Sequence, residues 1–473
     1  MFQDECFSRW VINGGKMRLL FIVMVLLGAI SFSHALPWAP GPFHDAWLTM
    51  FNGGDVKKFS EIIKEHPELI YQRDDSGMTL MHYAFSQSTT SHYKILLDAG
   101  ADVNVVDKDL WTPLHYGAKR GFTTTLQNII NKGAKIDVQN INGETPLYLA
   151  VNAREMSRDI LLRNGANPNI ANNDGNTPLH GLLTKIGDEE QTANMIRKLL
   201  AKQADQTLVN NAWDTPIALA LKVHYGPRVI QVLLDGKDVP INRADAHGDT
   251  PLIFALRQGY QTAIISAMLA KGADVKLTND QLQSPLFVAG AAPAEVWEQL
   301  LTKDAAVNAE DVDGRTPLFV AAQAGQAAYA DALLAHGATA TGVTLSLQQT
   351  TLMAAVQGGK VPLLEKIIAL APTALDTQDA QGNTALHLAT NTGNIEIMRS
   401  LLEHKADPNV QNVADDSPLH LAARDGNLPA ARLLLANGAD RTLKNAAQKT
   451  ALDEAINSGN TGLVKLLQAK VLI

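Results

Sequence analysis

The chain has 473 residues, with 40 lysines and arginines, 48 aspartates and glutamates, and a formal net charge of −8. Mild acidity argues against a nucleic-acid-binding protein, because phosphate recognition requires a basic face. The single cysteine, Cys6, excludes an intramolecular disulfide framework and any cysteine-rich metal site.

The first predicted element is a short apolar segment near the N-terminus. Residues 19–32 carry no charge, but they are fewer than the about 20 residues that a bilayer-spanning helix needs. Their length is typical of the apolar region of a secretory signal, and Ser33-His34-Ala35 follows with small residues at its first and third places. We therefore expect residues 1–35 to be a signal peptide, the alternative being an uncleaved signal anchor.

The residues before this segment do not fit a signal peptide. Asp4 and Glu5 lie where a positive charge is expected, whereas Met17-Arg18 would form a compact basic start. We therefore expect translation to begin at Met17. The chain has no N-glycosylation sequence and no cysteine at the predicted cleavage point, so it is expected to be a bacterial periplasmic or secreted protein.

A repeat of 32 to 38 residues covers the rest of the chain. Its clearest copies are the sequences TPLH at 112–115 and 177–180 and SPLH at 417–420. In every copy the third position is Leu, Ile or Met. The weaker copies complete a series of twelve anchors, which are Thr79, Thr112, Thr145, Thr177, Thr215, Thr250, Ser284, Thr316, Thr350, Thr384, Ser417 and Thr450.

Each repeat carries the signals of two short helices. The hydroxyl of the anchor Thr or Ser can accept a free N–H of the first helical turn, and Pro fits the position after it. The following segment has small side chains, as a tightly packed inner helix requires. A second helix is predicted over residues such as 125–132, and Gly133 then stops it.

One such unit cannot bury its apolar faces alone, so the copies must stack into a solenoid. The pattern of TPLH, helix pair and Gly-Ala ending resembles the ankyrin-repeat family. This resemblance implies an all-α ankyrin-repeat solenoid of about 13 helix-pair units with short hairpin turns. We expect an N-terminal capping repeat at 36–78, ankyrin repeats at 79–449 and a C-terminal capping repeat at 450–473.

Two segments depart from the pattern. The longest spacing adds residues at 185–191, which favours a surface loop over an acidic protrusion that a partner grips. Residues 340–349 lack turn signals, and Gln348 stands where the next repeat has Gly382. This second departure predicts a loosened joint in the array.

Five histidines, including His82, occupy the fourth anchor position. The resemblance implies that they are structural and form hydrogen bonds within and between repeats. The expected structural anchors are Thr112, Pro113, His115, Thr177, Pro178, His180, His387, Ser417, Pro418 and His420. No catalytic, metal-binding or cofactor-binding motif was found, so no catalytic residue, metal or cofactor is expected.

The resemblance implies a concave binding surface made of hairpin tips and the exposed side of the inner helices. Trp111 lies there beside Leu110, which occupies a slot that is usually Gly, and Trp213 occupies the same slot in a later repeat. Each indole is either a binding anchor or a brace packed on the adjacent hairpin. A basic row that would steer an acidic partner segment is predicted at Lys119, Arg120, Lys185, Lys222 and Arg257.

We predict a non-catalytic, exported, monomeric scaffold that binds another protein, with no nucleic acid and no membrane insertion after signal cleavage. Three alternatives stay open. The chain could be a periplasmic inhibitor, immunity or chaperone-like factor for an exported enzyme, or a secreted effector that binds host proteins. The third is a hydrolase hidden in a divergent unit such as 284–303, which no acid–base set supports.

Overall fold

The computed structural model describes residues 41–51, 55–86, 91–151, 153 and 155–468. The predicted signal peptide, with the proposed start at Met17, lies outside the described residues. The chain divides into two compact units, residues 1–173 and 174–473. Within the described ranges the structure is helical without a β-strand, and contains one isolated bridge between Val343 and Thr350.

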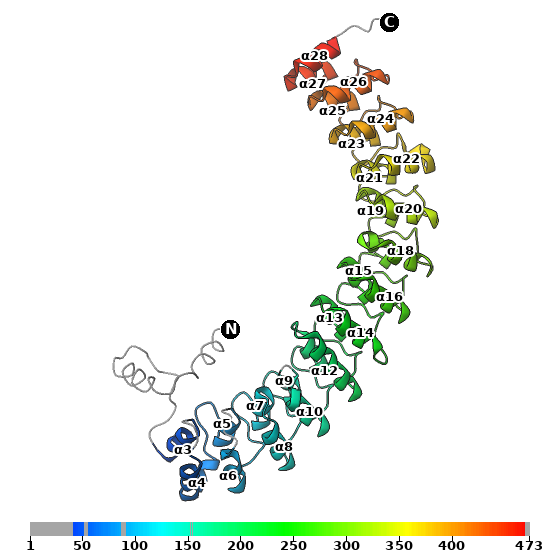
Figure 1. The fold of residues 1–473 in the computed structure, drawn as a ribbon. Coiled ribbons are helices and arrows are strands. Elements are labelled where there is room, and N and C mark those ends of the chain that lie inside the picture. Colours follow the sequence, from blue (N-terminus) through cyan, green and yellow to red (C-terminus); the bar gives the residue numbers. More distant parts are fainter. Residues whose placement is uncertain (1–40, 52–54, 87–90, 152, 154, 469–473) are drawn as a thin grey trace, which may run out of the picture. The chain divides into compact units, whose positions relative to one another are not determined.

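The first unit consists of successive helix pairs. Figure 1 shows α5, α7 and α9 in one row and α6, α8 and α10 in a second row. The helices are α3 (Pro42–Phe51), α4 (Val56–Glu65), η1 (Pro67–Ile70), α5 (Leu80–Ser86), α6 (His92–Asp98), α7 (Pro113–Arg120), α8 (Thr123–Asn131), α9 (Pro146–Ala150) and α10 (Glu155–Arg163).

The second unit repeats the same arrangement, which confirms the predicted all-α solenoid. Its helices are α11 (Pro178–Leu183), α12 (Glu189–Ala201), α13 (Pro216–Lys222), α14 (Pro227–Asp235), α15 (Pro251–Arg257), α16 (Thr262–Ala270), α17 (Pro285–Val288), η2 (Ala289–Ala291), α18 (Ala294–Leu301), α19 (Pro317–Gln323), α20 (Ala327–Ala335), α21 (Thr351–Gly358), α22 (Val361–Leu370), η3 (Pro372–Ala374), α23 (Ala385–Thr392), α24 (Ile395–Glu403), α25 (Pro418–Arg424), α26 (Leu428–Ala436), α27 (Ala451–Ser458) and α28 (Thr461–Gln468).

The first helix of each pair begins at the anchor, as α7 illustrates. Thr112 has extended backbone angles, its hydroxyl accepts the N–H of His115, and Pro113 follows in the first turn. Gly121 ends the helix with a φ of +83°. This backbone conformation strains any residue with a Cβ, so glycine is the natural helix stop here.

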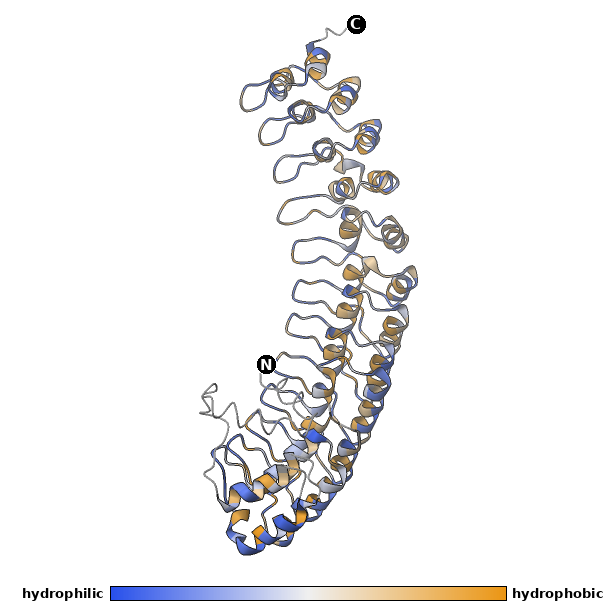
Figure 2. Cartoon of the chain, turned by 60° about the vertical axis from the view of Figure 1, so that its left-hand side comes forward, coloured by the Kyte–Doolittle hydropathy of each residue, from blue (hydrophilic) through white to orange (hydrophobic). Residues whose placement is uncertain are grey.

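Apolar residues from both rows form the core. The third anchor position supplies a fully buried side chain in most repeats, for example Leu114, Leu252 and Leu386, each at 0 or 1% exposure. Leu452 in the last repeat is only half-buried. The second helices contribute residues such as Leu126 and Ile129. Figure 2 shows that the loops between the pairs are mostly hydrophilic, so the apolar residues gather on the helices.

Neighbouring inner helices approach most tightly between α19 and α21. A Cβ added at Gly358 would lie 2.0 Å from the carbonyl oxygen of Ala322. No real Cβ tolerates such a distance from a backbone atom. Glycine at this position therefore sets the spacing between these two helices.

The predicted 185–191 loop is shorter than expected, because α12 already begins at Glu189. Its first residue is held in place by the Tyr225 hydroxyl, whose single proton is donated to the carbonyl oxygen of Lys185, with the carbonyl oxygen of Leu182 at 3.3 Å. Burial raises the pKa of Tyr225, which keeps this phenol a hydrogen-bond donor. The loop is thus anchored at one end.

The 340–349 segment still forms a hairpin despite its missing turn signals. Gln348 adopts a φ of +52°, the conformation that Gly382 has in the next repeat. The hydroxyl of Thr344 accepts the N–H of Gln349 at 2.9 Å and replaces the usual carboxylate or amide. Whether this joint is looser than the others stays a prediction.

Helices α3 and α4 lie within the predicted N-terminal capping repeat, and α27 and α28 lie within the predicted C-terminal one. The boundaries of these repeats stay predictions. In the described part of the chain, none of the helices is both long and apolar enough to cross a bilayer.

Candidate protein-binding surface

Each repeat begins with a hairpin, here called a finger, whose shape is fixed by hydrogen bonds. In the finger 107–111, Oδ1 of Asp107 accepts the N–H groups of Asp109 at 3.0 Å and of Trp111 at 2.8 Å. The N–H of Asp107 also donates to the carbonyl of Trp111 at 3.1 Å. The same pattern recurs with Asp311 in the finger 311–315.

Most successive fingers within each unit are joined backbone to backbone, an exception among the described residues being the fingers 210–214 and 245–249. In the first unit, the N–H of Lys108 donates to the carbonyl of Ser76 at 2.9 Å. In the second, the N–H of Val312 donates to the carbonyl of Gln281 at 3.1 Å. The fingers therefore form a preformed, ordered row.

One position in every finger, two residues before the anchor, has a left-handed backbone. Glycine fills it in half of the fingers, for example Gly77 and Gly248, with φ values of +80° and +74°. Leu110, Trp213 and Leu282 fill it elsewhere, with φ values of +61°, +63° and +58°. These three side chains are 46%, 58% and 51% exposed.

The sequence pointed to Leu110 and Trp213 in this slot but not to Leu282. The signal for Leu282 was present, because it also lies two residues before an anchor, Ser284. A left-handed conformation costs an L-residue about 1 to 2 kcal/mol. Large apolar residues in such a strained, exposed position suggest a function other than stability.

Trp111 is half-buried rather than exposed, unlike its neighbour Leu110. Its ring packs 5.0 Å from that of Tyr116, and the ammonium of Lys119 lies 5.1 Å from the ring centroid. These ring contacts lie within its own repeat, so the packing on the adjacent hairpin that a bracing role requires stays a prediction. Arg120, the next residue of the predicted basic row, is exposed at the end of α7.

Lys222 of the predicted basic row is neutralised by carboxylates. Its ammonium lies 2.6 Å from Asp214 and 2.9 Å from Asp245, both of which have nearly buried side chains. Burial alone would lower the pKa of Lys222, but the hydrogen bonds to the two aspartates outweigh burial and raise it. Burial likewise opposes ionisation of Asp245, yet the hydrogen bond from Lys222 holds its pKa below the usual range.

Arg257 has the same kind of partner. Its guanidinium donates to Asp249 at 2.7 Å and to the side-chain oxygen of Gln283 at 3.2 Å. Lys222 and Arg257 of the predicted basic row are therefore both paired with carboxylates, whereas Lys119 and Arg120 are exposed at the end of α7. That the row steers an acidic segment stays a prediction.

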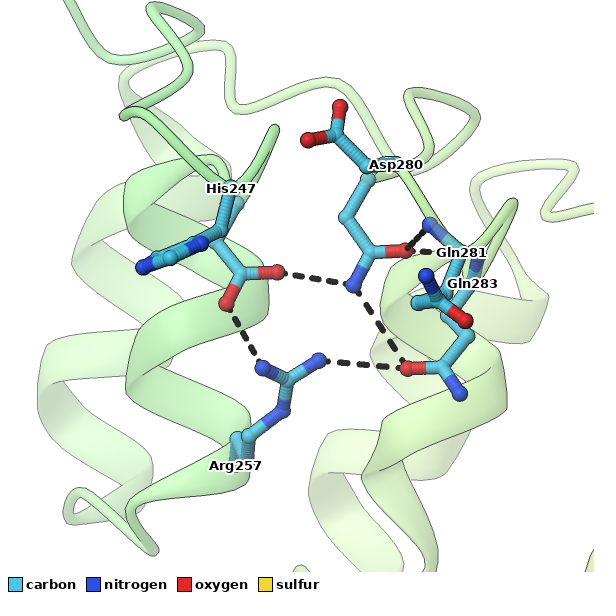
Figure 3. A pocket seen from close by; sticks show the side chains of 7 residues that line it. His247, Arg257, Asp280, Gln281 and Gln283 are labelled. Carbon is cyan, nitrogen blue, oxygen red and sulfur yellow. Dashed lines mark hydrogen bonds and ion pairs between the residues drawn. The ribbon is translucent and has the colours of Figure 1, made fainter.

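A hollow of about 520 Å³ lies between the fingers 245–249 and 279–283. Figure 3 shows the side chains that line it. Arg257 and Asp249 lie at its base, and Asn279 donates to Asp249 at 2.8 Å. His247 and Asp280 stand at the fingertips on its two sides. The hollow is polar, and its floor is cross-linked by hydrogen bonds.

The anchor histidines lie within the stack, as expected from their register. Nδ1 of His115 accepts the N–H of Thr112 at 3.0 Å, so the ring proton lies on Nε2, which donates to the carbonyl of Glu144 at 3.1 Å. His180, His387 and His420 make the same two contacts with Thr177 and Asp214, Thr384 and Asp416, and Ser417 and Lys449.

These imidazoles are buried in the stack and carry no ligand role there. Burial lowers the pKa of His82, His115, His180 and His387, although the hydrogen bonds to carbonyls oppose the shift. Pro113, Pro178 and Pro418 occupy the first turns of α7, α11 and α25. In the part of the chain that the structure covers, no three His, Cys, Asp or Glu side chains gather as metal ligands.

Comparison with known families and proteins agrees with this architecture. A family model described as ankyrin repeats (three copies) matches residues 50–140, 114–190, 261–344, 337–412 and 407–471. These matches together cover well over half of the chain.

Curated relatives are similar over part of their length. Rabankyrin-5 of Homo sapiens is 26% identical over 361 residues, which are 73% of this chain and 28% of that protein. Ankyrin repeat protein nuc-2 of Neurospora crassa is 29% identical over 38% of this chain and 17% of its own length. NF-kappa-B inhibitor delta of Mus musculus is 30% identical over 36% of this chain and 61% of its own. The chain thus spans less than a third of the first two relatives, and all three are eukaryotic.

Proposed function

The chain belongs to the ankyrin-repeat family, and from this premise we propose that it is a non-catalytic scaffold that binds a partner protein. The partner would contact the row of fingers and the exposed side of the inner helices. The observation that carries the proposal is the exposure of Leu110 and Trp213 in left-handed fingertip slots. Exposed apolar side chains held at an energetic cost are typical of interaction sites.

The geometry supports tight binding by a preformed surface. Each finger is closed by its own hydrogen bonds, and most neighbouring fingers within a unit are joined to one another. Binding then orders few groups, so little of the contact energy is lost to conformational entropy. The side chains at the fingertips would set the specificity.

The experiment is affinity capture with the chain from residue 36 onward, using wild type and the variant Leu110→Ala plus Trp213→Ala. A matched control removes two exposed apolar side chains away from the fingers, Met156→Ala plus Leu370→Ala, on α10 and α22. We expect the fingertip variant to lose at least tenfold in captured partner, and the control to keep it. Equal capture by all three proteins would overturn the proposal.

A second capture experiment separates the two tryptophans. Trp213 is exposed, whereas Trp111 is half-buried against Tyr116 and Lys119. We expect Trp213→Ala to reduce capture more than Trp111→Ala does, relative to the amount of folded protein. The opposite order would make the inner-helix side of the surface, rather than the fingertips, the main contact.

We also propose that the mature chain works outside the cytoplasm. The support is the apolar segment 19–32 followed by Ser33-His34-Ala35. Expression of the intact gene, followed by fractionation and N-terminal sequencing, tests this proposal. A mature protein beginning at Leu36 outside the cytoplasm is expected, and a peptide covering Phe2 to Arg9 in the mature protein would contradict it.

A second candidate is an inhibitor that sequesters its partner. The observation that favours it is the similarity to a protein named as an inhibitor, NF-kappa-B inhibitor delta. An inhibitor would abolish the activity of a captured enzyme at equimolar concentration, whereas a scaffold would leave that activity unchanged. An activity assay of the captured partner therefore separates the two roles.

A further inference from the structure

Two large apolar fingertips flank a small one in the second unit. Trp213 and Leu282 occupy the same left-handed slot in the fingers 210–214 and 279–283. The finger between them, 245–249, carries Gly248 in that slot. A segment that crosses these three fingers meets an exposed indole, a low glycine tip and an exposed leucine in order.

The hollow beside the low finger is open and carries an unpaired negative charge. It lies between the fingers 245–249 and 279–283, and Asp280 stands at its rim (Figure 3). The Asp280 side chain is exposed and has no ion-pair partner among the residues that the structure describes. Asp249 and Arg257, deeper in the hollow, neutralise each other.

The surrounding repeats have an excess of negative charge. The fingers 210–214, 245–249, 279–283 and 311–315, with the helices α13, α15, α17 and α19, hold six aspartates and three cations. Each of the three cations, Lys222, Arg257 and Arg315, is already bound by an aspartate. The remaining field favours a cationic ligand and opposes an acidic one.

We propose that this surface, from Trp213 to Leu282, binds a basic and apolar segment of the partner polypeptide. Two apolar side chains of the segment pack against Trp213 and Leu282. A lysine or arginine between them enters over Gly248 and pairs with Asp280. This inference rests on the proposed function and names the chemistry of the partner.

The surface supplies both affinity and selectivity for such a segment. Apolar contacts at the two tips remove exposed indole and leucine surface from water. A long cationic side chain can lay its methylene groups over the glycine tip while its charge reaches the carboxylate. An acidic segment would instead place its charge against Asp280 and the unpaired negative field.

The test uses synthetic peptides of defined chemistry. Fluorescein-labelled twelve-residue peptides with alternating leucine and lysine, leucine and glutamate, or glycine and lysine are titrated with the chain from residue 36 onward. Measurements at 0.15 M salt limit non-specific attraction to the acidic protein. We expect the leucine–lysine peptide to bind at least tenfold more tightly than either of the other two.

Charge inversion then locates the site. Asp280→Lys should weaken binding of the leucine–lysine peptide at least tenfold, and Leu282→Ala should weaken it severalfold. Asp75→Lys is the matched control, because Asp75 is an exposed fingertip residue in the same register of the first unit. Lysine suits this register, since Lys108 occupies it naturally, so both variants are expected to fold.

Each remaining outcome counts against the inference. Equal loss in Asp280→Lys and Asp75→Lys would show attraction to the overall charge rather than to this surface. If the leucine–glutamate peptide bound as tightly as the leucine–lysine peptide, the apolar tips alone would determine the affinity. If the fingertip variants lose the natural partner while the leucine–lysine peptide fails to bind, the scaffold function stands and the partner chemistry proposed here is wrong.

Discussion

The Nε2 atom of His115 donates a hydrogen bond to the carbonyl oxygen of Glu144, 3.1 Å away in the next finger. The other ring nitrogen accepts the N–H of Thr112. One fully buried imidazole thus joins the start of a helix to the following repeat. Neighbouring repeats are tied together by a polar contact in addition to their apolar core.

Replacing this imidazole should destabilise the first unit. In His115→Ala, the N–H of Thr112 and the carbonyl of Glu144 lose buried partners, which costs about 1 to 3 kcal/mol for each unsatisfied group. We expect the free energy of unfolding, measured by urea denaturation, to fall by about 2 to 4 kcal/mol. His66→Ala, at an exposed surface pair, is the control and should change stability by less than about 1 kcal/mol.

The same histidines predict loss of stability in mild acid. Burial lowers the pKa of His82, His115, His180 and His387 in the folded chain below the unfolded value of about 6.5. Their contribution is therefore complete only well above pH 6.5. It falls as the pH drops through 6.5, because the unfolded chain then binds protons that the folded chain does not.

Urea denaturation at pH 7.5, 6.5 and 5.5 measures this dependence. The free energy of unfolding should fall between the first two values and fall more steeply between the last two. His115→Ala should show a shallower fall, because it removes one of the buried rings. A free energy that rises toward pH 5.5 would show that the folded histidines bind protons more readily than the unfolded ones.

Removing Lys222 should expose the cost of its two nearly buried aspartates. Breaking a fully buried ion pair costs about 3 to 5 kcal/mol, and Lys222 retains 29% side-chain exposure, so about 2 to 3 kcal/mol is expected for Lys222→Ala. The loss should be largely recovered in the triple variant Lys222→Ala, Asp214→Asn, Asp245→Asn. Asparagine already occupies these two registers elsewhere, at Asn176 and Asn279. No recovery in thermal or urea denaturation would mean that the lysine acts by packing alone.

Trp213 offers a direct measurement of fingertip strain. Trp213→Ala and Trp213→Gly both remove the indole, but only glycine relieves the left-handed backbone. The relief of about 1 to 2 kcal/mol is partly offset by about 0.5 to 1 kcal/mol of added unfolded-state entropy. We expect Trp213→Gly to be more stable than Trp213→Ala by about 0.5 to 1 kcal/mol, and both to lose partner binding equally.

Gly358 should not tolerate a side chain. The Cβ of Gly358→Ala would collide with the carbonyl of Ala322, so α21 must move away from α19. A loss of about 1 to 3 kcal/mol is expected, as for other overpacked cores. Gly187→Ala is the control, because its Cβ would meet only the Thr192 hydroxyl at 3.4 Å. Equal stability of the two variants by thermal denaturation would show that the α19–α21 spacing is adjustable.

The helix pairs and their anchors were predictable because their signals act within one repeat. Thr112 caps a helix whose N–H groups lie three residues away, and Gly121 supplies a left-handed stop directly after it. Such local rules depend little on the rest of the fold. Because the repeats are in register, the same rules also predicted helix starts at Thr215 and Ser417, and both residues cap helices in the structure.

The electrostatics of the surface were not predictable from the same local signals. Lys222 and Arg257 reach back eight residues to Asp214 and Asp249, along the whole inner helix to the last residue of the finger before it. Whether such an ion pair forms depends on the orientation of the two side chains, which the sequence does not give. The two ion pairs share one sequence pattern, an aspartate directly before the anchor and a cation at the end of the inner helix.

The tryptophans show a second limit of sequence reasoning. Trp111 and Trp213 lie near the tips of two different fingers, but one ring packs onto Tyr116 and the other is 58% exposed. Trp111 lies one residue before its anchor and Trp213 lies two, so a shift of one position separates a half-buried ring from an exposed one. Which of the two rings is buried depends on the three-dimensional shape of the finger, which the residue pattern alone does not specify.

The backbone bonds between fingers all run the same way. The N–H of Val312 points back to Gln281, and that of Leu345 points back to Asp313. The row therefore has a head and a tail, like a single strand with its dipoles aligned. An extended ligand that lies along it meets a different surface in each orientation, so a peptide and its reversed sequence are two distinct ligands for this protein.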